Sequence, residues 1–237
     1  MIWIILFVLT ILVSAFLAYR SMKNYQVVPQ KNSLSFAFFL IRDGSLLSAE
    51  IFQKLAAIAK NLNTQISLER VFKGSDQALI LYAPRQIQNN FPELGLIEIE
   101  DYLENSKFKI DQNDTFGFLI NSKNNSDKLN SNENYLKNLK LEDSNQVCLQ
   151  VVLKPESNES LLFQSTFRVM VVAKDPNIKV TLLKNIEGQI SEYLGLSRGE
   201  SLSAAALFEG YKKRSLVPKE ITNFELSAAE IKALLGL

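Results

Sequence analysis

Four acidic residues near the middle of the chain are the first candidates for chemistry. Glu98, Glu100, Asp101 and Glu104 all fall within "EIEDYLE". Side chains alternate along a strand, so Glu98 and Glu100 share one face if the segment is extended. Paired carboxylates could bind a cation or carry out acid/base catalysis. The competing interpretation is the solvated face of an edge strand, where charged runs usually lie, and we favour it.

Nucleophiles and soft metal ligands are scarce. The chain has no histidine and one cysteine, Cys148, so the commonest general base and transition-metal ligand is missing. Cys148 lies inside the apolar run "QVCLQVVLK", where we interpret it as a small buried hydrophobic residue with no group to activate it. We therefore predict no catalytic, cofactor-binding or metal-binding residues. One cysteine also allows no intramolecular disulfide, which fits a reducing compartment.

The sequence contains no phosphate-binding loop. A Walker A motif needs the frame GxxxxGK[ST], and no glycines of the chain fall on it. Gly195 and Gly199 come nearest, but their spacing is one residue short, and Glu200 stands where the lysine should be. An acidic side chain there would repel phosphate, so we predict that the chain neither binds nor hydrolyses nucleoside triphosphates.

The one basic run, "YKKRS", contains Lys212, Lys213 and Arg214. These three residues could contact anionic lipid headgroups, nucleic acid or a partner, with lipid ahead of nucleic acid because the protein is tethered. The competing interpretation, which we favour, is the basic C-terminal end of a helix, where cations are stabilised in any case. Over the whole chain 26 basic residues face 25 acidic ones, so a global electrostatic case for nucleic-acid binding is missing.

The N-terminal stretch is predicted to be a membrane anchor. Residues 1–19 carry no charged side chain, and twelve of them are Ile, Leu, Val or Phe. As a helix this run would be about 28 Å long, close to the thickness of the hydrocarbon core. Trp3 and Tyr19 lie near its two ends, where aromatic residues meet the membrane interface. We expect residues 1–20 to form one transmembrane helix.

Retention and orientation of this helix follow from its flanks. A signal peptide would begin with a basic segment, whereas the apolar residues here begin at Ile2, and the candidate cleavage site around Ser14 would cut inside the apolar run. Arg20 and Lys23 follow the helix. The positive-inside rule then places the N-terminus outside and the rest of the chain in the cytoplasm.

After a tether at 21–32, the elements run in the order β-α-β-β-α-β. Residues 33–41 are apolar on both faces, which indicates a central strand. A helix with one buried stripe follows from Ser45, then an alternating strand at 64–72 with one wet side, a strand at 77–83, a short helix beginning at Pro84, and an alternating strand at 95–102. This order is that of a ferredoxin-like fold, so we predict an α+β module at 33–105.

A second, less regular module with a similar order of strands and helices is predicted at 106–196. Two alternating strands, "QVCLQVVLK" and "STFRVMVVAK", should form an antiparallel pair. Asp175 and Pro176 suit the start of a helix with a stripe of Leu182, Ile186, Ile190 and Tyr193. Residues 121–145 are rich in asparagine and predict a surface insertion with at most a short helix. Residues 197–237 then form a C-terminal helical segment whose apolar faces pack on the sheet or dock a partner helix.

The sequences and order of these segments resemble a family of membrane-anchored bacterial proteins, mostly of unknown function, related to the N-terminal regions of type IV secretion (conjugation) ATPases. The stretches that carry the resemblance are "SFAFFLIRDG", "ALILYAPRQIQNNFPELGLIEIEDY", "QVCLQVVLKPES", "FRVMVVAKDPNIKVTLLKNIEGQISEY" and "ITNFELSAAEIKALLGL". The chain departs from the ATPase-bearing members because it lacks the phosphate-binding loop. The resemblance implies a separately encoded ATPase as partner.

Two hypotheses from different classes follow. The first is a non-enzymatic, membrane-anchored accessory or scaffold protein that presents two ferredoxin-like modules to a cytoplasmic protein partner, with no nucleic acid and no cofactor. The second is a membrane-tethered sensor or ligand-binding module that uses the sheet face of one module. A pocket between the modules would favour the second.

Overall fold

The computed structural model describes residues 35–104, 110, 112–121, 136, 139, 141–155, 162–199, 203–216 and 224–237. The predicted anchor and tether, with Trp3, Tyr19, Arg20 and Lys23, lie outside these residues. None of the described helices combines the length and the apolar character needed to cross a membrane. Residues 36–237 form one compact unit.

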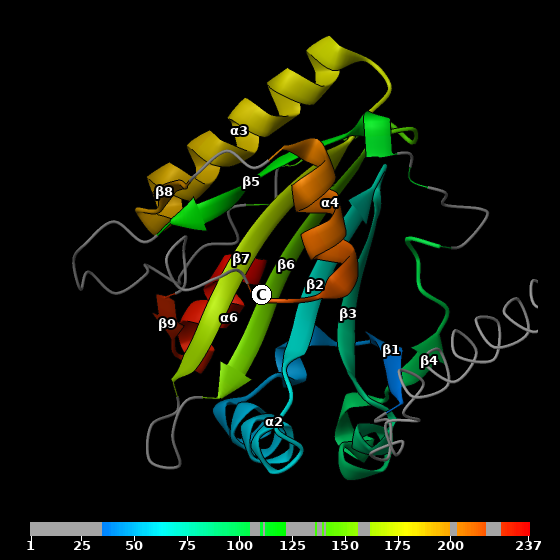
Figure 1. Cartoon of the computed structure of the whole chain (residues 1–237), viewed down its shortest axis with the longest axis vertical. Helices are drawn as coiled ribbons and strands as arrows, with labels where there is room; N and C mark the ends of the chain where they lie inside the picture. The colour runs from blue at the N-terminus through cyan, green and yellow to red at the C-terminus, as the bar shows by residue number, and fades with distance from the viewer. Residues whose placement is uncertain are drawn as a thin grey trace, which may run out of the picture. The chain divides into compact units, whose positions relative to one another are not determined.

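Nine strands of the described chain form one sheet (Figure 1), in the order β4-β1-β3-β2-β6-β7-β5-β8, with β9 (Phe224–Leu226) paired to β7. Every neighbouring pair is antiparallel. The predicted α+β class is therefore confirmed.

The first half of the sheet comes from residues 36–99. Its elements are β1 (Phe36–Ile41), the 3₁₀ helix η1 (Gly44–Leu46), α2 (Ala49–Asn61), β2 (Ile66–Lys73), β3 (Asp76–Pro84), the 3₁₀ helices η2 (Arg85–Asn90) and η3 (Pro92–Leu94), and β4 (Ile97–Ile99). Helix α2 begins later than predicted, because the hydroxyl of Ser48 accepts a hydrogen bond from the Ile51 amide and caps it. Strand β1 lies between β4 and β3, as its two apolar faces predicted.

The second half follows a similar course. Its elements are the 3₁₀ helix η4 (Gln112–Asp114), β5 (Thr115–Asn121), β6 (Gln146–Pro155), β7 (Phe163–Val172), α3 (Pro176–Leu194) and β8 (Ser197–Arg198). The predicted pairing of "QVCLQVVLK" with "STFRVMVVAK" is confirmed as the β6–β7 ladder. Helix α3 begins at the predicted cap, where the carboxylate of Asp175 accepts from the Asn177 amide.

The two halves meet at a ladder between β2 and β6. It runs without interruption from the pair Ile66–Leu153 to the pair Lys73–Gln146. The halves therefore share one hydrogen-bonded seam in the middle of the sheet.

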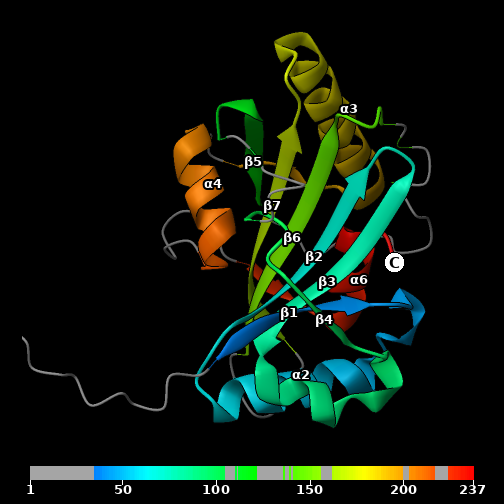
Figure 2. The ribbon, with the colours of Figure 1, turned by 90° about the vertical axis from the view of Figure 1, so that its right-hand side faces the viewer.

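Helices lie on both faces of the sheet (Figures 1 and 2). Helices α2, α3 and α6 (Ala228–Leu235) lie on one face, and α4 (Ala204–Lys213) lies on the other. The first face carries the main core, in which Phe39, Leu68, Leu149, Phe167 and Ile231 are buried. The two C-terminal helices that the structure describes pack on the protein's own sheet, which was one of the two predicted alternatives, with α4 against β5 and β7 and α6 against β6.

Three local predictions need correction. Pro84 is the last residue of β3, and the segment after it forms two 3₁₀ helices in place of one short α-helix. The buried stripe of α3 ends on Leu194, whereas Tyr193 is exposed. Strand β2 has no wet side over its first five residues, because it lies at the centre of the sheet and the end of α4 contacts its second face through Arg214.

Part of the asparagine-rich segment 121–145 is described. Leu136 is buried in the main core, and Leu139 and Leu141 pack against the same core. These apolar residues anchor the segment to the sheet. The prediction of a surface insertion concerns mainly residues that lie outside the described ones.

Candidate functional site

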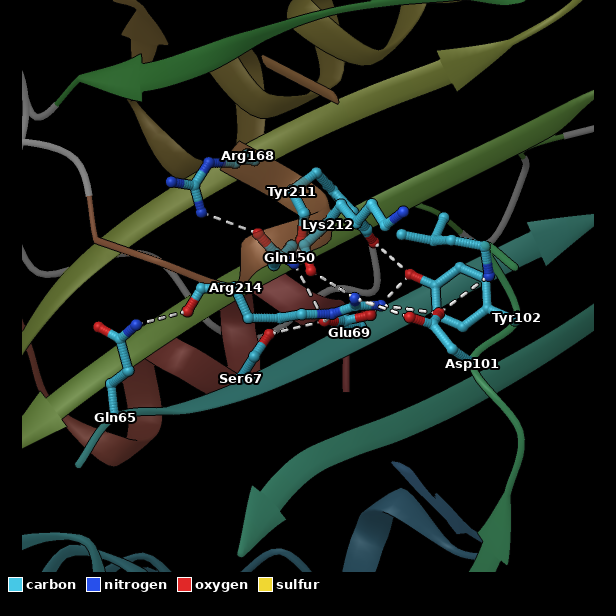
Figure 3. Close-up of polar contacts among 11 residues, drawn as sticks. Gln65, Ser67, Glu69, Asp101, Tyr102, Gln150, Arg168, Tyr211, Lys212 and Arg214 are labelled. Carbon is cyan, nitrogen blue, oxygen red and sulfur yellow. Dashed lines mark hydrogen bonds and ion pairs between the residues drawn. The ribbon is translucent and has the colours of Figure 1, made fainter. Parts of the chain in front are cut away.

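Charged and polar side chains are buried on the face of the sheet that carries α4. Glu69 on β2, Gln150 on β6 and Arg168 on β7 lie side by side across three neighbouring strands, since the register pairs Glu69 with Gln150 and Gln150 with Arg168. All three are at most 1% exposed. Burying a charge costs several kcal/mol unless it is paired and hydrogen-bonded, so their partners define the site (Figure 3).

Glu69 is the centre of this buried ionic cluster. Its Oε1 accepts hydrogen bonds from Ser67 Oγ at 2.9 Å, Gln150 Nε2 at 3.0 Å and Arg214 Nε at 3.1 Å. Its Oε2 accepts from the Tyr102 hydroxyl at 2.6 Å. The carboxylate is therefore satisfied on both oxygens within the protein.

Arg214 brings the positive charge from the end of α4. It adopts the left-handed conformation at the C-cap, with φ of 48°, which turns the chain back toward the sheet. Its guanidinium also contacts Asp101, with Nη1 3.0 Å from Oδ2 and Nη2 3.1 Å from Oδ1. Burial alone lowers the pKa of Arg214, but the negative charges of Glu69 and Asp101 more than offset this and raise it, so the group stays charged.

Two tyrosines connect the cluster to the loop after β4. The Tyr102 hydroxyl donates to Glu69 and lies 2.8 Å from the Tyr211 hydroxyl. Because Tyr102 donates its one hydroxyl proton to Glu69, the Tyr211 hydroxyl is the donor, and the Tyr102 oxygen the acceptor, in the hydrogen bond between the two tyrosines. Burial, and then the negative charge of Glu69, raises the pKa of both phenols well above their usual range. Both tyrosines therefore remain neutral donors at physiological pH.

Arg168 extends the cluster to β7. Its Nη1 donates to Gln150 Oε1 at 2.8 Å, and its Nη2 donates to the Ser215 carbonyl. Gln150 links Arg168 to the centre of the cluster, because its Nε2 donates to Glu69 and to the Tyr211 carbonyl. Burial lowers the pKa of Arg168 to about 10, which still leaves the guanidinium charged at neutral pH.

The arrangement is suited to holding segments together. It joins β2, β6, β7, the loop after β4 and the end of α4, which are far apart in sequence. Cys148 lies close by on β6, and burial raises the pKa of its thiol, so it is held as the unreactive thiol. The described residues contain no group of three or more candidate metal ligands. The cluster fixes α4 on the sheet.

Beside this cluster lies an apolar sheet face. We define the apolar face as Phe36, Phe38 and Leu40 on β1, Tyr82 on β3, and Ile97 and Ile99 on β4. Phe38 pairs directly with Tyr82 and with Ile99, and Leu40 pairs with Ile97, so these side chains share one side of the sheet. The alternate residues of β1, among them Phe39, point into the main core on the other side.

The apolar face is partly open to solvent. Ile97 is 38% exposed, and the other five residues are half-buried. The rings of Phe36 and Phe38 lie 5.0 and 4.8 Å from that of Tyr82. The guanidinium carbon of Arg214 lies 4.4 Å from the ring centre of Phe38, so the buried ionic cluster borders this face directly. Among the described α-helices α4 is the one on this side of the sheet, and it contacts β5 and β7.

The four acidic candidates separate into different environments. Glu98 lies on the edge strand β4 and pairs with Arg85, with Nη2 2.5 Å from Oε1. Glu104 pairs with Lys212 at 2.8 Å. Asp101 belongs to the buried ionic cluster. Glu98 and Glu100 are exposed, as the interpretation of a solvated edge strand predicted.

The basic run also separates. Lys212 and Lys213 are exposed and pair with Glu104 and Glu209. Arg214, the third candidate contact for lipid or a partner, has a side chain only 3% exposed. The reason is the left-handed C-cap, which turns this residue under the helix toward Glu69 and Asp101.

Sequence reasoning missed Glu69, Tyr102, Gln150, Arg168 and Tyr211. A usable signal was present for one of them. Arg168 is the only charged residue of β7, and a charge in a central strand must find a partner. The partner of Glu69 could not be found from spacing alone, because Arg214 is 145 positions away.

Comparisons with known proteins found no match that would assign this site to a known family. No family model matches the chain, and no curated protein matches it.

Proposed function

We propose that this chain is a non-enzymatic accessory or scaffold protein that presents its α+β modules to a protein partner. The observation that carries the proposal is the apolar face. Six large apolar side chains on β1, β3 and β4 are half-buried or exposed on one side of the sheet. Contiguous apolar surface on a folded protein commonly marks an interaction site.

We further propose that the two halves are ferredoxin-like modules. The strand order β4-β1-β3-β2 of the first half supports this, and β6-β7-β5-β8 repeats that order in reverse for the second half. The first module keeps its first helix, α2, and the second keeps the helix before its last strand, α3. Antiparallel strands in this order with two crossing helices are the pattern of the fold.

The cellular setting of the proposal comes from the sequence. The charge-free run at residues 1–19, followed by Arg20 and Lys23, supports an anchor in the bacterial cytoplasmic membrane with the modules in the cytoplasm. The resemblance to the N-terminal regions of type IV secretion ATPases supports a separately encoded ATPase as the partner. The protein then supplies attachment and the partner supplies the motor.

Site-specific photocrosslinking in cells tests this function. A photoreactive amino acid placed at Leu40 or at Ile97 should capture the same protein from the membrane fraction, identified by mass spectrometry. Val180 on α3 is the matched control, because it is an apolar residue 47% exposed away from the apolar face. Capture of an ATPase at both test positions and not at Val180 supports the proposal. Equal capture at all three positions, or none, refutes it.

A further inference from the structure

We propose that the apolar face binds one amphipathic α-helix of a protein partner, in the place that corresponds to α4 on the other half of the sheet. This inference rests on the proposed function and names the structure of the segment that the partner presents.

The two halves of the sheet correspond strand for strand. The order β4-β1-β3-β2 of the first half matches β8-β5-β7-β6 of the second. Both halves turn the same face toward the main core, where the cross-strand pairs Phe39–Leu81 and Phe118–Val169 are buried. The strands β1 and β3 therefore correspond to β5 and β7, and both strand pairs turn their second face to the side of the sheet that carries α4.

Helix α4 covers this second face in one half only (Figures 1 and 2). It packs on β5 and β7 and buries Leu207 and Tyr211, which lie four positions apart on one stripe of the helix. The corresponding surface over β1 and β3 belongs to the apolar face, which no described helix covers and where Ile97 is 38% exposed. The fold itself thus shows which kind of element packs on strands in this position.

The dimensions of the apolar face match those of a short helix. It extends over β4, β1 and β3, which is about 10 Å between the outer strands, and an α-helix with its side chains is about 10–12 Å across. Along β1, the distance from Phe36 to Leu40 is about 13 Å, the length of about nine helical residues. Helix α4 has 10 residues.

Backbone chemistry favours a helix over an extended segment. The apolar face presents side chains to a partner, and the one hydroxyl among them is that of Tyr82. A helix satisfies its main-chain hydrogen bonds internally, whereas an extended segment needs the edge of a sheet. A helix with apolar residues at positions i, i+4 and i+7 places them all on such a face.

The contact differs from that of α4 in one respect. On β5, Gly117 lets the Leu207 side chain of α4 come close to the strand, whereas β1 has Phe36, Phe38 and Leu40 on this face. A helix bound here would therefore rest on aromatic and aliphatic side chains, farther from the backbone than α4 lies.

Arg214 borders the face on the side of α4 without selecting a charged partner. Its guanidinium carbon lies 4.4 and 5.3 Å from the ring centres of Phe38 and Tyr82. Glu69 and Asp101 compensate its charge. Affinity should therefore come from apolar burial, and added salt should change it little.

A lactam-bridged helical peptide of about 14 residues, or four turns, is a direct probe. Leucines form one stripe, and lysine and glutamate in equal number fill the other positions. A photoreactive amino acid replaces Ile97 in the full chain in detergent micelles, and mass spectrometry maps the peptide residues that become attached. We expect attachment at peptide positions three or four apart, with a yield that salt changes little.

A scrambled peptide of the same composition, with leucines on all sides, gives the background. It should attach no more than the helical peptide attaches to a photoreactive residue at Val180, which is exposed on α3. Equal yields for the two peptides, attachment at positions two apart, or attachment of Ile97 to detergent alone would overturn the proposal. The last result would indicate a face that contacts the membrane.

Substitutions on the face provide a second test. Ile97→Glu should weaken binding of the helical peptide about tenfold, because it places a charge where an apolar side chain is buried on binding. Ile97→Leu should bind as the parent does. The matched control is Val180→Glu, which adds the same charge at an exposed apolar residue of α3. Equal affinities of Ile97→Glu and Val180→Glu would contradict the inference.

Circular dichroism checks that each variant is folded. Phe36→Glu, at the other end of the face, gives an independent measurement with the same expected loss of binding. Fluorescence anisotropy of the labelled peptide measures each affinity.

The outcomes distinguish this inference from the proposed function. If Leu40 and Ile97 capture a partner in cells but the helical peptide does not attach to the face, the docking function stands and the helix inference is refuted. If the peptide attaches with helical spacing but no partner is captured, the helix inference stands and the proposed function is refuted.

Discussion

Glu69 and Arg214 form a buried ion pair between the middle of the sheet and the end of α4. Arg214 Nε lies 3.1 Å from Glu69 Oε1, and the side chains of Arg214 and Glu69 are 3% and 0% exposed. Since 145 positions separate them, the pair can form only when β2 and α4 are both in place. Formation of this ion pair therefore requires the assembled tertiary structure.

Replacing Arg214 with methionine should destabilise the protein by about 3–5 kcal/mol, because it leaves the carboxylate of Glu69 buried without its counter-charge. Denaturant unfolding followed by circular dichroism measures this. The double variant Glu69→Gln/Arg214→Met should recover part of the loss, which a double-mutant cycle quantifies.

Lys213→Met is the matched control for Arg214→Met, since it removes a charge from the neighbouring residue of the same basic run. The Lys213 side chain is 70% exposed, so the change should stay within about 0.5 kcal/mol. Equal effects of the two substitutions would contradict the buried position of Arg214.

Stability should fall as the pH rises above 10. The phenols of Tyr102 and Tyr211 have an ordinary pKa of 10.0, and the folded protein raises the pKa of both. Above pH 10 the unfolded chain therefore loses these protons before the folded protein does, which favours unfolding. Unfolding free energies measured between pH 8 and about 11.5 check this. The decline should be smaller in Tyr102→Phe. Absorbance of phenolate gives an independent reading, and ionisation of all tyrosines of the folded protein near pH 10 would contradict the prediction.

Gly117→Ala should strongly destabilise the packing of α4. A methyl group at this position of β5 would collide with the Val169 carbonyl oxygen of the neighbouring strand and with the Leu207 side chain of α4. Thermal unfolding measures the loss. Gly188→Ala is the control, because Gly188 lies inside α3 and a methyl group there would meet nothing within 4 Å. That substitution should stabilise the protein by about 0.5–1 kcal/mol. Similar effects of the two changes would show that the close approach at Gly117 is unimportant.

Isothermal titration of the full chain with ATP and magnesium should show no binding, because the sequence has no glycine-rich loop with a following lysine. Micromolar binding would overturn this, and turnover abolished by Glu98→Gln or Glu100→Gln would move an enzymatic function to first place.

Much of the fold follows from local patterns in the sequence. The apolar faces of residues 36–41 placed β1 inside the sheet, and Asp175 with Pro176 marked the start of α3. The two alternating runs that became β6 and β7 paired as predicted. These features depend on side-chain periodicity and capping, which are set within a few residues.

The buried ionic cluster could not be predicted in the same way. Alternation along β2 indicated a wet side at Ser67 and Glu69, and nothing near them in sequence revealed that α4 would return to cover it. Arg214 looked like part of an exposed basic run, whereas its left-handed C-cap turns it inward. Such contacts depend on long-range topology, which local periodicity does not encode.

The seam between β2 and β6 limits how the chain can be divided. If residues 35–104 were expressed alone, β2 would lose its partner along all eight of its residues and become a long open edge. Antiparallel pairing is self-complementary, so β2 of one copy could take the place of β6 for another. The fragment is therefore expected to associate into dimers or larger species, and its mass by light scattering would show whether the two halves can exist apart.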